Sequence, residues 1–136
     1  MIQVFCNERG AGKTKKLIEL ANEQLKIAKG VSVYIDDDCS YIRQVDRRIR
    51  FIATKEYRII DEDSFYGLLC GIICGNYDIE NIYIDGMFNM INRNNDKLAI
   101  FFIKINELAE KNNLNMYINI NFESKLLPEF IKKYVA

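Results

Sequence analysis

Short apolar runs along this chain alternate with longer stretches in which apolar residues recur every three or four positions. The short runs predict buried strands, because consecutive apolar side chains cover both faces of a sheet. Five strands are expected, at residues 2–6, 31–35, 51–53, 81–86 and 114–122. The last of them differs from the others, since its apolar positions alternate with asparagine and tyrosine.

The helical spacing of apolar residues predicts three long and two short helices. They are expected at residues 13–29, 40–49, 61–75, 96–111 and 128–134. Ser40 is the candidate N-cap of the second helix, and Asp61 or Asp63 begins the third. Residues 86–94 are expected to form a loop or a short apolar helix. Because strands alternate with helices, the predicted fold is α/β: a single three-layer α/β/α domain with a mainly parallel five-stranded sheet, spanning residues 1–136.

The turn between the first strand and the first helix has the sequence NERGAGKT and carries the clearest chemical signal. It nearly matches the phosphate-binding pattern G-x-x-x-x-G-K-[ST], with Asn7 in place of the first glycine. Gly10 and Gly12 allow backbone N–H groups to converge on an anion at a helix N-terminus. In that geometry Lys13 would contact the β- and γ-phosphates, and the Thr14 hydroxyl would bind Mg²⁺.

Asparagine tolerates left-handed backbone angles, so Asn7 replaces the glycine of the pattern at modest cost. The alternative is a glycine-rich turn without function, which the strand–turn–helix setting disfavours. The predicted nucleotide contacts are Asn7, Arg9, Gly10, Ala11, Gly12, Lys13, Thr14 and Lys15.

Aspartates stand at the ends of two other predicted strands. Asp85 follows the apolar residues 82–84, and Asp36, with Asp37 and Asp38, follows residues 31–35. Ligands of open α/β sheets gather at the carboxyl ends of the strands, so both positions lie on the expected functional edge. Asp36 is therefore the candidate for orienting an attacking water. The alternative is that one aspartate caps the next helix and the others are solvated.

The last predicted strand carries Asn119 and Asn121 near its end. If this strand lies beside the first one, either asparagine would lie near the phosphate site and could contact a γ-phosphate or a water. A turn at the end of the strand explains these residues equally well.

Together, NERGAGKT and the segment IYIDG resemble the P-loop NTPase superfamily, whose minimal core the whole chain matches in length. The chain is also similar to short bacterial P-loop proteins sometimes labelled as relatives of the twitching-motility retraction ATPases. The resemblance implies that Lys13 is catalytic, and that Thr14 and Asp85 hold Mg²⁺. Gly86 departs from the pattern, since many ATP-hydrolysing members carry a glutamate there. Asp36 is then the predicted catalytic substitute.

Composition narrows the choice of partners. Lys+Arg and Asp+Glu both number 19, so no net basic charge favours nucleic acid or an anionic membrane. No apolar run reaches the roughly 20 residues that span a bilayer, and no signal-peptide pattern is visible, so the cytoplasm is the expected location. Histidine is absent, which excludes histidine-based triads and most zinc sites.

The remaining features allow two interpretations each. The cysteines, which lack C-x-x-C spacing, are expected to be buried thiols, with a Cys70–Cys74 redox pair as the alternative. Glycines recur every four residues in the third helix, which predicts close packing on the sheet or, alternatively, a dimer seam. Four arginines lie on or just after the helix expected at residues 40–49. They are expected to be solvated, with binding to phosphates or to an acidic partner as the alternative: Arg43, Arg47, Arg48 and Arg50.

The predicted function is binding of a Mg²⁺-nucleotide, with slow or partner-stimulated hydrolysis. ATP is favoured over GTP because no N-K-x-D motif is present. A nucleotide-gated or degenerate interaction module without enzymatic activity is the alternative, and a homodimer or another protein is the candidate partner. A small nucleoside or nucleotide kinase ranks third, because the short linkers leave little room for an acceptor lid.

Overall fold

The computed structural model describes residues 1–7, 12–91, 94–122 and 124–136. Five strands form one sheet in the order β1-β5-β4-β2-β3, and every pairing is parallel. The strands are β1 (Ile2–Asn7), β2 (Val31–Asp36), β3 (Arg50–Ala53), β4 (Ile79–Ile84) and β5 (Asn115–Asn121). Each lies within two residues of an apolar run that predicted it, because these runs bury side chains on both faces of the sheet.

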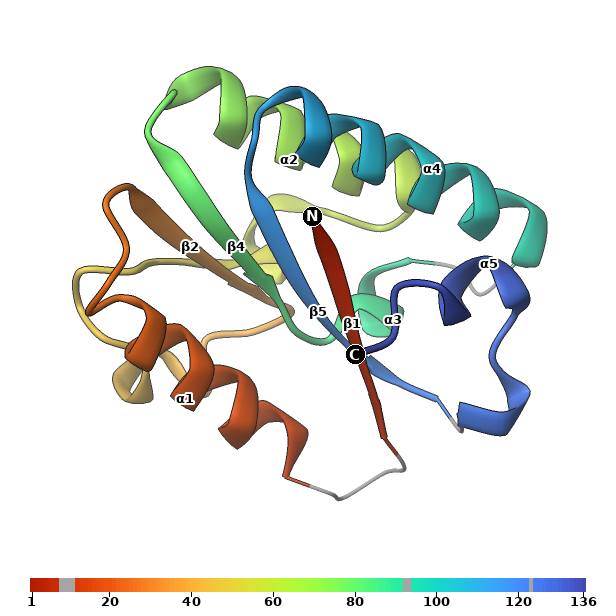
Figure 1. Cartoon of the computed structure of the whole chain (residues 1–136), viewed down its shortest axis with the longest axis horizontal. Coiled ribbons are helices and arrows are strands. Elements are labelled where there is room, and N and C mark those ends of the chain that lie inside the picture. The colour runs from red at the N-terminus through yellow and green to blue at the C-terminus, as the bar shows by residue number, and fades with distance from the viewer. Residues whose placement is uncertain (8–11, 92–93, 123) are drawn as a thin grey trace.

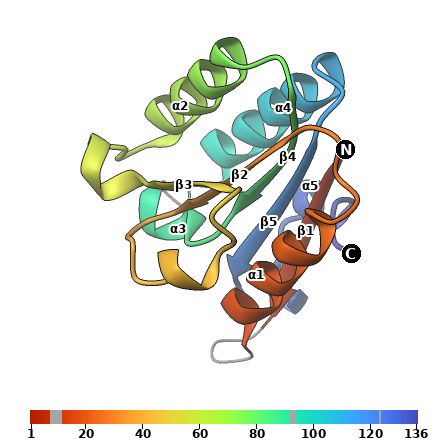
Figure 2. The ribbon, with the colours of Figure 1, turned by 90° about the vertical axis from the view of Figure 1, so that its left-hand side faces the viewer.

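Helices cover both faces of this sheet. Helix α1 (Lys13–Gln24) lies on one side, and α2 (Glu62–Gly75) and α4 (Asn95–Lys111) lie side by side on the other (Figures 1 and 2). The shorter elements are α3 (Met87–Met90), α5 (Glu129–Lys132) and the 3₁₀ turns η1 (Ile42–Gln44), η2 (Thr54–Tyr57) and η3 (Ser124–Leu126). The predicted three-layer α/β/α fold is confirmed.

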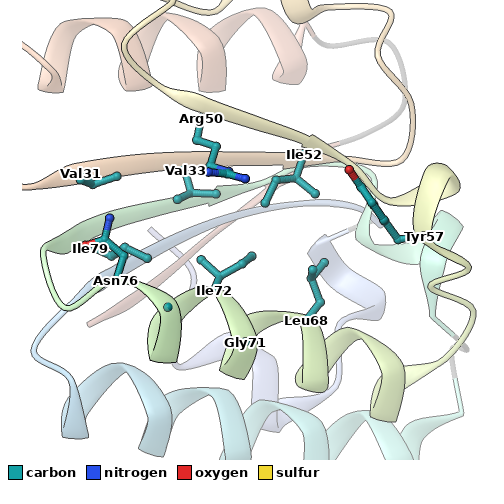
Figure 3. A pocket seen from close by; sticks show the side chains of 11 residues that line it. Val31, Val33, Arg50, Ile52, Tyr57, Leu68, Gly71, Ile72, Asn76 and Ile79 are labelled. Carbon is teal, nitrogen blue, oxygen red and sulfur yellow. The ribbon is translucent and has the colours of Figure 1, made fainter.

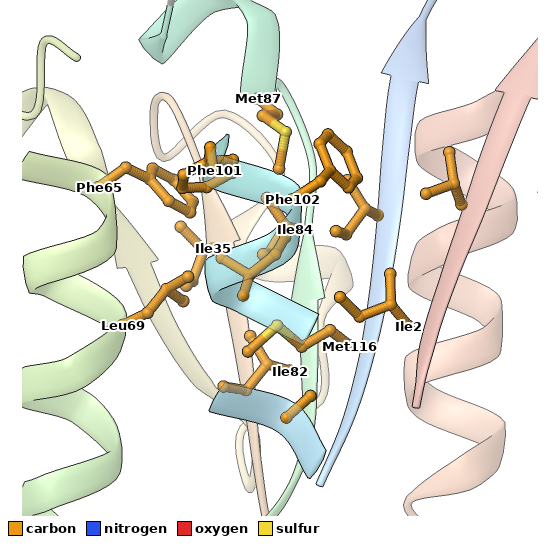
Figure 4. Packing of buried hydrophobic residues seen from close by; sticks show 14 of the residues in the cluster. Ile2, Ile35, Phe65, Leu69, Ile82, Ile84, Met87, Phe101, Phe102 and Met116 are labelled. Atoms are coloured by element: carbon orange, nitrogen blue, oxygen red, sulfur yellow. The ribbon is translucent and has the colours of Figure 1, made fainter. Parts of the chain in front are cut away.

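The larger core fills the space between the sheet and helices α2 and α4 (Figure 4). Each fully buried aliphatic or aromatic side chain contributes about 1.5–3 kcal/mol relative to an exposed one, so this layer is a major source of stability. Among its buried members are Val4, Ile35, Ile82, Ile84, Met116 and Ile118 from the strands, and Phe65, Leu69, Phe101 and Phe102 from the helices.

A row of aromatic rings crosses the opposite face, beneath α1. Neighbouring strands contribute Phe51, Tyr34, Tyr83 and Tyr117, whose adjacent ring centroids lie 5.6, 6.2 and 5.2 Å apart in nearly parallel planes. Gln24 of α1 accepts a hydrogen bond from the Tyr83 hydroxyl and donates one to the Tyr117 oxygen. The amide therefore satisfies two hydroxyls that would otherwise be buried without partners.

β1 is the edge strand that leads into the predicted phosphate turn. It pairs with β5 on one side, and on the other side the described residues provide one bridge, between Val4 and Val135. The Val4 N–H donates to the Tyr134 carbonyl at 2.8 Å, and the Ala136 N–H donates to the Val4 carbonyl at 3.0 Å. The two ends of the chain thus meet at this strand.

Two helix predictions need correction. The helix expected at residues 40–49 is reduced to the 3₁₀ turn η1, and Ser40 is not its N-cap. The Asp38 carboxylate accepts the Ser40 N–H at 3.0 Å and forms a local turn that competes with a helix. Helix α1 ends at Gln24 rather than residue 29, because the Lys29 and Gly30 N–H groups bond to the Glu80 carboxylate and direct the chain into β2.

The glycines of α2 do not pack closely on the sheet, so that expectation was wrong. A Cβ atom at Gly67, Gly71 or Gly75 would meet no atom of the described chain within 4 Å. The helix packs through Phe65 and Leu69 instead, which are fully buried. The glycine face is open, and its use as a dimer seam stays a prediction.

Other surface expectations have mixed outcomes. Cys39 and Cys74 are exposed rather than buried. Arg48 pairs with Asp46 at 3.0 Å on the surface, as a solvated basic segment would. None of the helices in the described ranges is both long enough and apolar enough to cross a membrane.

Candidate functional site

Three adjacent strands end in nearly the same tripeptide, which builds the floor of the candidate site. These are Tyr34-Ile35-Asp36 on β2, Tyr83-Ile84-Asp85 on and after β4, and Tyr117-Ile118-Asn119 on β5. Side chains alternate along a strand, so the first and third residue of each tripeptide face α1. The tyrosines form the buried aromatic row, and the polar residues form the next row, at the carboxyl edge of the sheet. Neighbouring members of that row are about 5 Å apart, the spacing of paired strands.

Lys13 opens α1 above this edge. Gly12 precedes it with a φ of 70°, a left-handed conformation that glycine adopts without strain. The Lys13 ammonium donates to Asn121 Oδ1 at 3.0 Å, and Asn119 Nδ2 donates to the Lys13 carbonyl at 3.0 Å. Both asparagines belong to β5, the strand between β1 and β4. The N-terminus of α1 is therefore attached to the strand next to the one that ends at Asp85.

The Asp85 carboxylate is largely buried, with 8% of the residue exposed. Its Oδ1 accepts the Gly86 N–H at 2.9 Å, and the Tyr34 hydroxyl donates to its Oδ2 across 3.4 Å. Gly86 has a φ of 67°, and a Cβ atom there would lie 3.0 Å from Asp36 Oδ1 and 3.1 Å from Asp37 Oδ1. A side chain at the position that follows Asp85 would therefore be strained, and the neighbouring carboxylates would have to shift to admit it.

Asp36 lies beside Asp85 on the adjacent strand and is also buried. Burial raises the pKa of Asp36 to about 8, and a side-chain hydrogen bond with Asp37 and the charge of Asp85 contribute in the same direction. Asp36 consequently holds a proton at neutral pH in the ligand-free protein.

Replacing Asp36 with asparagine is expected to change how stability depends on pH. The raised pKa means that the folded state keeps this proton up to pH about 8, whereas an unfolded aspartate releases it near pH 4. Stability therefore falls as pH rises through this window. We expect the increase in the free energy of unfolding caused by Asp36→Asn to be larger at pH 8.5 than at pH 5, by at least about 1.4 kcal/mol. Urea titrations at the two pH values test this, and an equal difference at both would contradict it.

The structure brings several of the predicted site residues to one edge. Gly12, Lys13 and Thr14 lie at the start of α1, and Asp36 and Asp85 lie at the ends of neighbouring strands. Thr14 is half-buried and Lys15 is exposed. The backbone of Asn7 pairs with Asn121 at the end of β1. The predicted contacts Arg9, Gly10 and Ala11 lie outside the described residues.

Asp37 and Asp38 have structural partners that the sequence did not predict. Asp37 accepts a hydrogen bond from the Asn89 side chain at 3.2 Å, and its carbonyl accepts the Lys55 N–H at 3.0 Å. Asp38 forms the turn at Ser40 described above. These two aspartates thus connect the acidic edge to the segments around it.

The donors at this edge are compatible with Mg²⁺. Within the described ranges, no three His, Cys, Asp or Glu side chains are grouped to hold a metal ion by themselves. Mg²⁺ commonly binds through one or two protein oxygens and takes its other ligands from phosphate and water, which is what Thr14 and Asp85 would leave open. The charge of Asp85 contributes to the raised pKa of Asp36, after burial and the hydrogen bond with Asp37, and a divalent cation would offset that charge.

A larger groove lies on the other face, between α2 and the strands β2 and β3 (Figure 3). Its volume is 490 Å³, its walls are mainly aliphatic, and Arg50 is the one charged residue among its lining residues. It therefore lacks the convergent polar groups of a catalytic site. A cavity of 250 Å³ lies under the first turns of α1, and its lining includes both Lys13 and Asn119. Chemistry rather than volume thus favours the carboxyl edge.

Comparisons with known proteins bear on the fold. No family model and no curated protein matches the sequence. Among solved structures, the chain is similar to the crystal structure of the flagellar accessory protein FlaH from Methanocaldococcus jannaschii, with a TM-score of 0.58 and 16% sequence identity. The match covers 97% of this chain, which spans 65% of the FlaH chain. At this identity the likeness concerns the fold alone, and it agrees with the predicted three-layer α/β/α architecture.

Proposed function

We propose that this chain binds a Mg²⁺-nucleotide, ATP in the first place, at the carboxyl edge beneath the N-terminus of α1. One observation carries the proposal: Lys13, the first residue of α1, is bonded over the end of β5, and the adjacent strand ends at the buried Asp85. This arrangement places a cation and a carboxylate on either side of one strand end. A Mg²⁺–triphosphate group has the complementary pattern of charges.

Each residue has a distinct part in the proposed site. Backbone N–H groups of the turn before α1 and the dipole of this helix would bind the phosphates, and Lys13 would neutralise charge on the β- and γ-oxygens. Thr14 and Asp85 would hold Mg²⁺, which when bound offsets the charge of the transferring phosphoryl group. Asn121, the present partner of the Lys13 ammonium, would then be free to bond to the γ-phosphate or to a water.

Hydrolysis is proposed to be slow. Water would attack the γ-phosphorus, the bond to the bridging oxygen would break, and Asp36 would accept a proton from the water. The raised pKa of Asp36 keeps its carboxyl protonated at neutral pH until a cation binds nearby and favours the ionised form. Gly86 has no side chain that could serve as a base in its place. A partner that supplies a cation would increase the rate. The same two observations favour, as second candidate, a nucleotide-gated interaction module that binds without turnover.

Calorimetric titration with Mg²⁺-ATP and Mg²⁺-GTP tests the binding, and a single-turnover assay of phosphate release tests the chemistry. We expect ATP to bind and phosphate to be released over minutes or longer. Binding without release would favour the interaction module. No heat of binding at millimolar nucleotide, with the fold intact, would refute the proposed function.

A further inference from the structure

We infer that Tyr34 is a positioning residue, whose hydroxyl holds the Asp85 carboxylate in the orientation that binds a divalent cation. The inference rests on the proposed function, because it assigns Asp85 a metal, but it concerns a residue that neither the sequence motifs nor the fold singles out. It follows from three features of the structure: the contact between the two side chains, the immobility of the tyrosine ring, and the way both oxygens of Asp85 are used.

The contact joins two buried groups. Tyr34 is fully buried and Asp85 is 8% exposed, and the Tyr34 hydroxyl lies 3.4 Å from Asp85 Oδ2. Hydrogen bonds between a hydroxyl and a carboxylate are usually 2.5–2.7 Å long, so this one is loose in the ligand-free state. Such bonds often shorten when a ligand completes the site.

The ring that carries this hydroxyl has little freedom. It is stacked between Phe51 of β3 at 5.6 Å and Tyr83 of β4 at 6.2 Å, so the sheet itself fixes where the hydroxyl lies. A donor held by packing can orient its acceptor, whereas a mobile donor would follow it. Partners of this kind around metal ligands commonly change metal affinity 10- to 100-fold when they are removed.

Both oxygens of Asp85 then have a fixed neighbour. Oδ1 accepts the Gly86 N–H at 2.9 Å, and Oδ2 faces Tyr34. Each carboxylate oxygen can accept two hydrogen bonds or ligands, so each keeps one position for a cation or its water. Without the Tyr34 hydroxyl, only the hydrogen bond from the Gly86 N–H to Oδ1 would restrain rotation of the carboxylate about its Cβ–Cγ bond.

Tyr34→Phe removes the hydroxyl and keeps the stacked ring, and Tyr83→Phe is the matched control. Tyr83 belongs to the same aromatic row and is equally buried, but its hydroxyl donates to Gln24 rather than to Asp85. We expect Tyr34→Phe to raise the Mg²⁺ concentration needed for half-maximal ATP binding about tenfold. Affinity for ATP without Mg²⁺ should change less than twofold, and Tyr83→Phe should resemble the wild type in both measurements. Equal effects of the two variants would overturn the inference.

A second readout needs no nucleotide. Mn²⁺ should broaden the NMR signal of the Gly86 amide, next to Asp85, and the Tyr34→Phe protein should need about ten times more Mn²⁺ for the same broadening. Selective broadening at Gly86 that requires about ten times more Mn²⁺ in the Tyr34→Phe protein, without any ATP binding, would support the role of Tyr34 and refute the proposed function. ATP binding with no dependence on Tyr34 would refute only the role of Tyr34. Absence of selective broadening in the wild type, without ATP binding, would refute both.

Discussion

Replacing Lys13 with alanine is expected to weaken Mg²⁺-ATP binding about 100-fold and to leave the fold intact. Hydrogen bonds to a charged group contribute about 1.5–3 kcal/mol each, and the ammonium would bond to more than one phosphate oxygen. Lys13 is half-buried, and the bond from its ammonium to Asn121 is exposed, so the loss of this bond should cost little stability. Isothermal titration calorimetry measures the affinity, and circular dichroism verifies the fold.

Lys16→Ala provides the matched control for this variant. Lys16 lies on the same helix one turn further on and is exposed, and none of the predicted nucleotide contacts involves it. We expect its removal to change affinity no more than about threefold at physiological salt. Equal losses in the two variants would mean that net charge, rather than a specific contact with Lys13, determines binding.

Introducing a glutamate after Asp85, where many ATP-hydrolysing P-loop proteins carry one, should damage this protein. Gly86→Glu is expected to lower the free energy of unfolding by about 2–4 kcal/mol, since a left-handed residue with a side chain costs about 1–2 kcal/mol and crowding adds a similar amount. The new Cβ would lie 3.0 Å from Asp36 Oδ1, and the new charge would face two aspartates. Urea unfolding measures the change, and we expect no gain in phosphate release.

Two further glycine variants separate the causes of this loss. Gly86→Ala keeps the backbone strain and the crowding without the charge, so it should account for most of the destabilisation. Gly71→Ala lies in the interior of α2, where an added Cβ would meet no described atom within 4 Å, and it should stabilise the protein by about 0.5–1 kcal/mol. A neutral Gly86→Ala variant would show that the loop around Asp36 adjusts easily.

The strands were predictable because each has its own apolar run, and the sequence near Lys13 indicated the candidate site through local chemistry. Helix boundaries were less predictable. The segment around Ser40 has apolar residues at helical spacing, but Asp38 and Asp46 hold the backbone in turns by accepting the N–H groups of Ser40 and Arg48. Local side-chain competition of this kind is invisible to apolar periodicity.

The neighbourhood of Asp36 and Asp85 depends on the order of the strands, which no local pattern determines. The sequence separates the two aspartates by 49 positions, and they meet because β4 pairs with β2. A signal was nevertheless present in the repeated tripeptides that begin at Tyr34, Tyr83 and Tyr117. Identical alternation at three strand ends indicates one aromatic row and one polar row, and would have directed attention to Tyr34.

The pairing of β1 with β5 also has a consequence for folding during synthesis on the ribosome. Ile2 pairs with Met116, so β1 gains its neighbour in the sheet only after β5, the last of the five strands along the chain, has been synthesised. Contacts this distant along the chain form slowly. A nascent chain that stalls before β5 would contain Lys13 without the strand to which Lys13 is bonded. A product that ends before β5 would therefore keep Lys13 and lack Asn119 and Asn121, to which Lys13 is bonded.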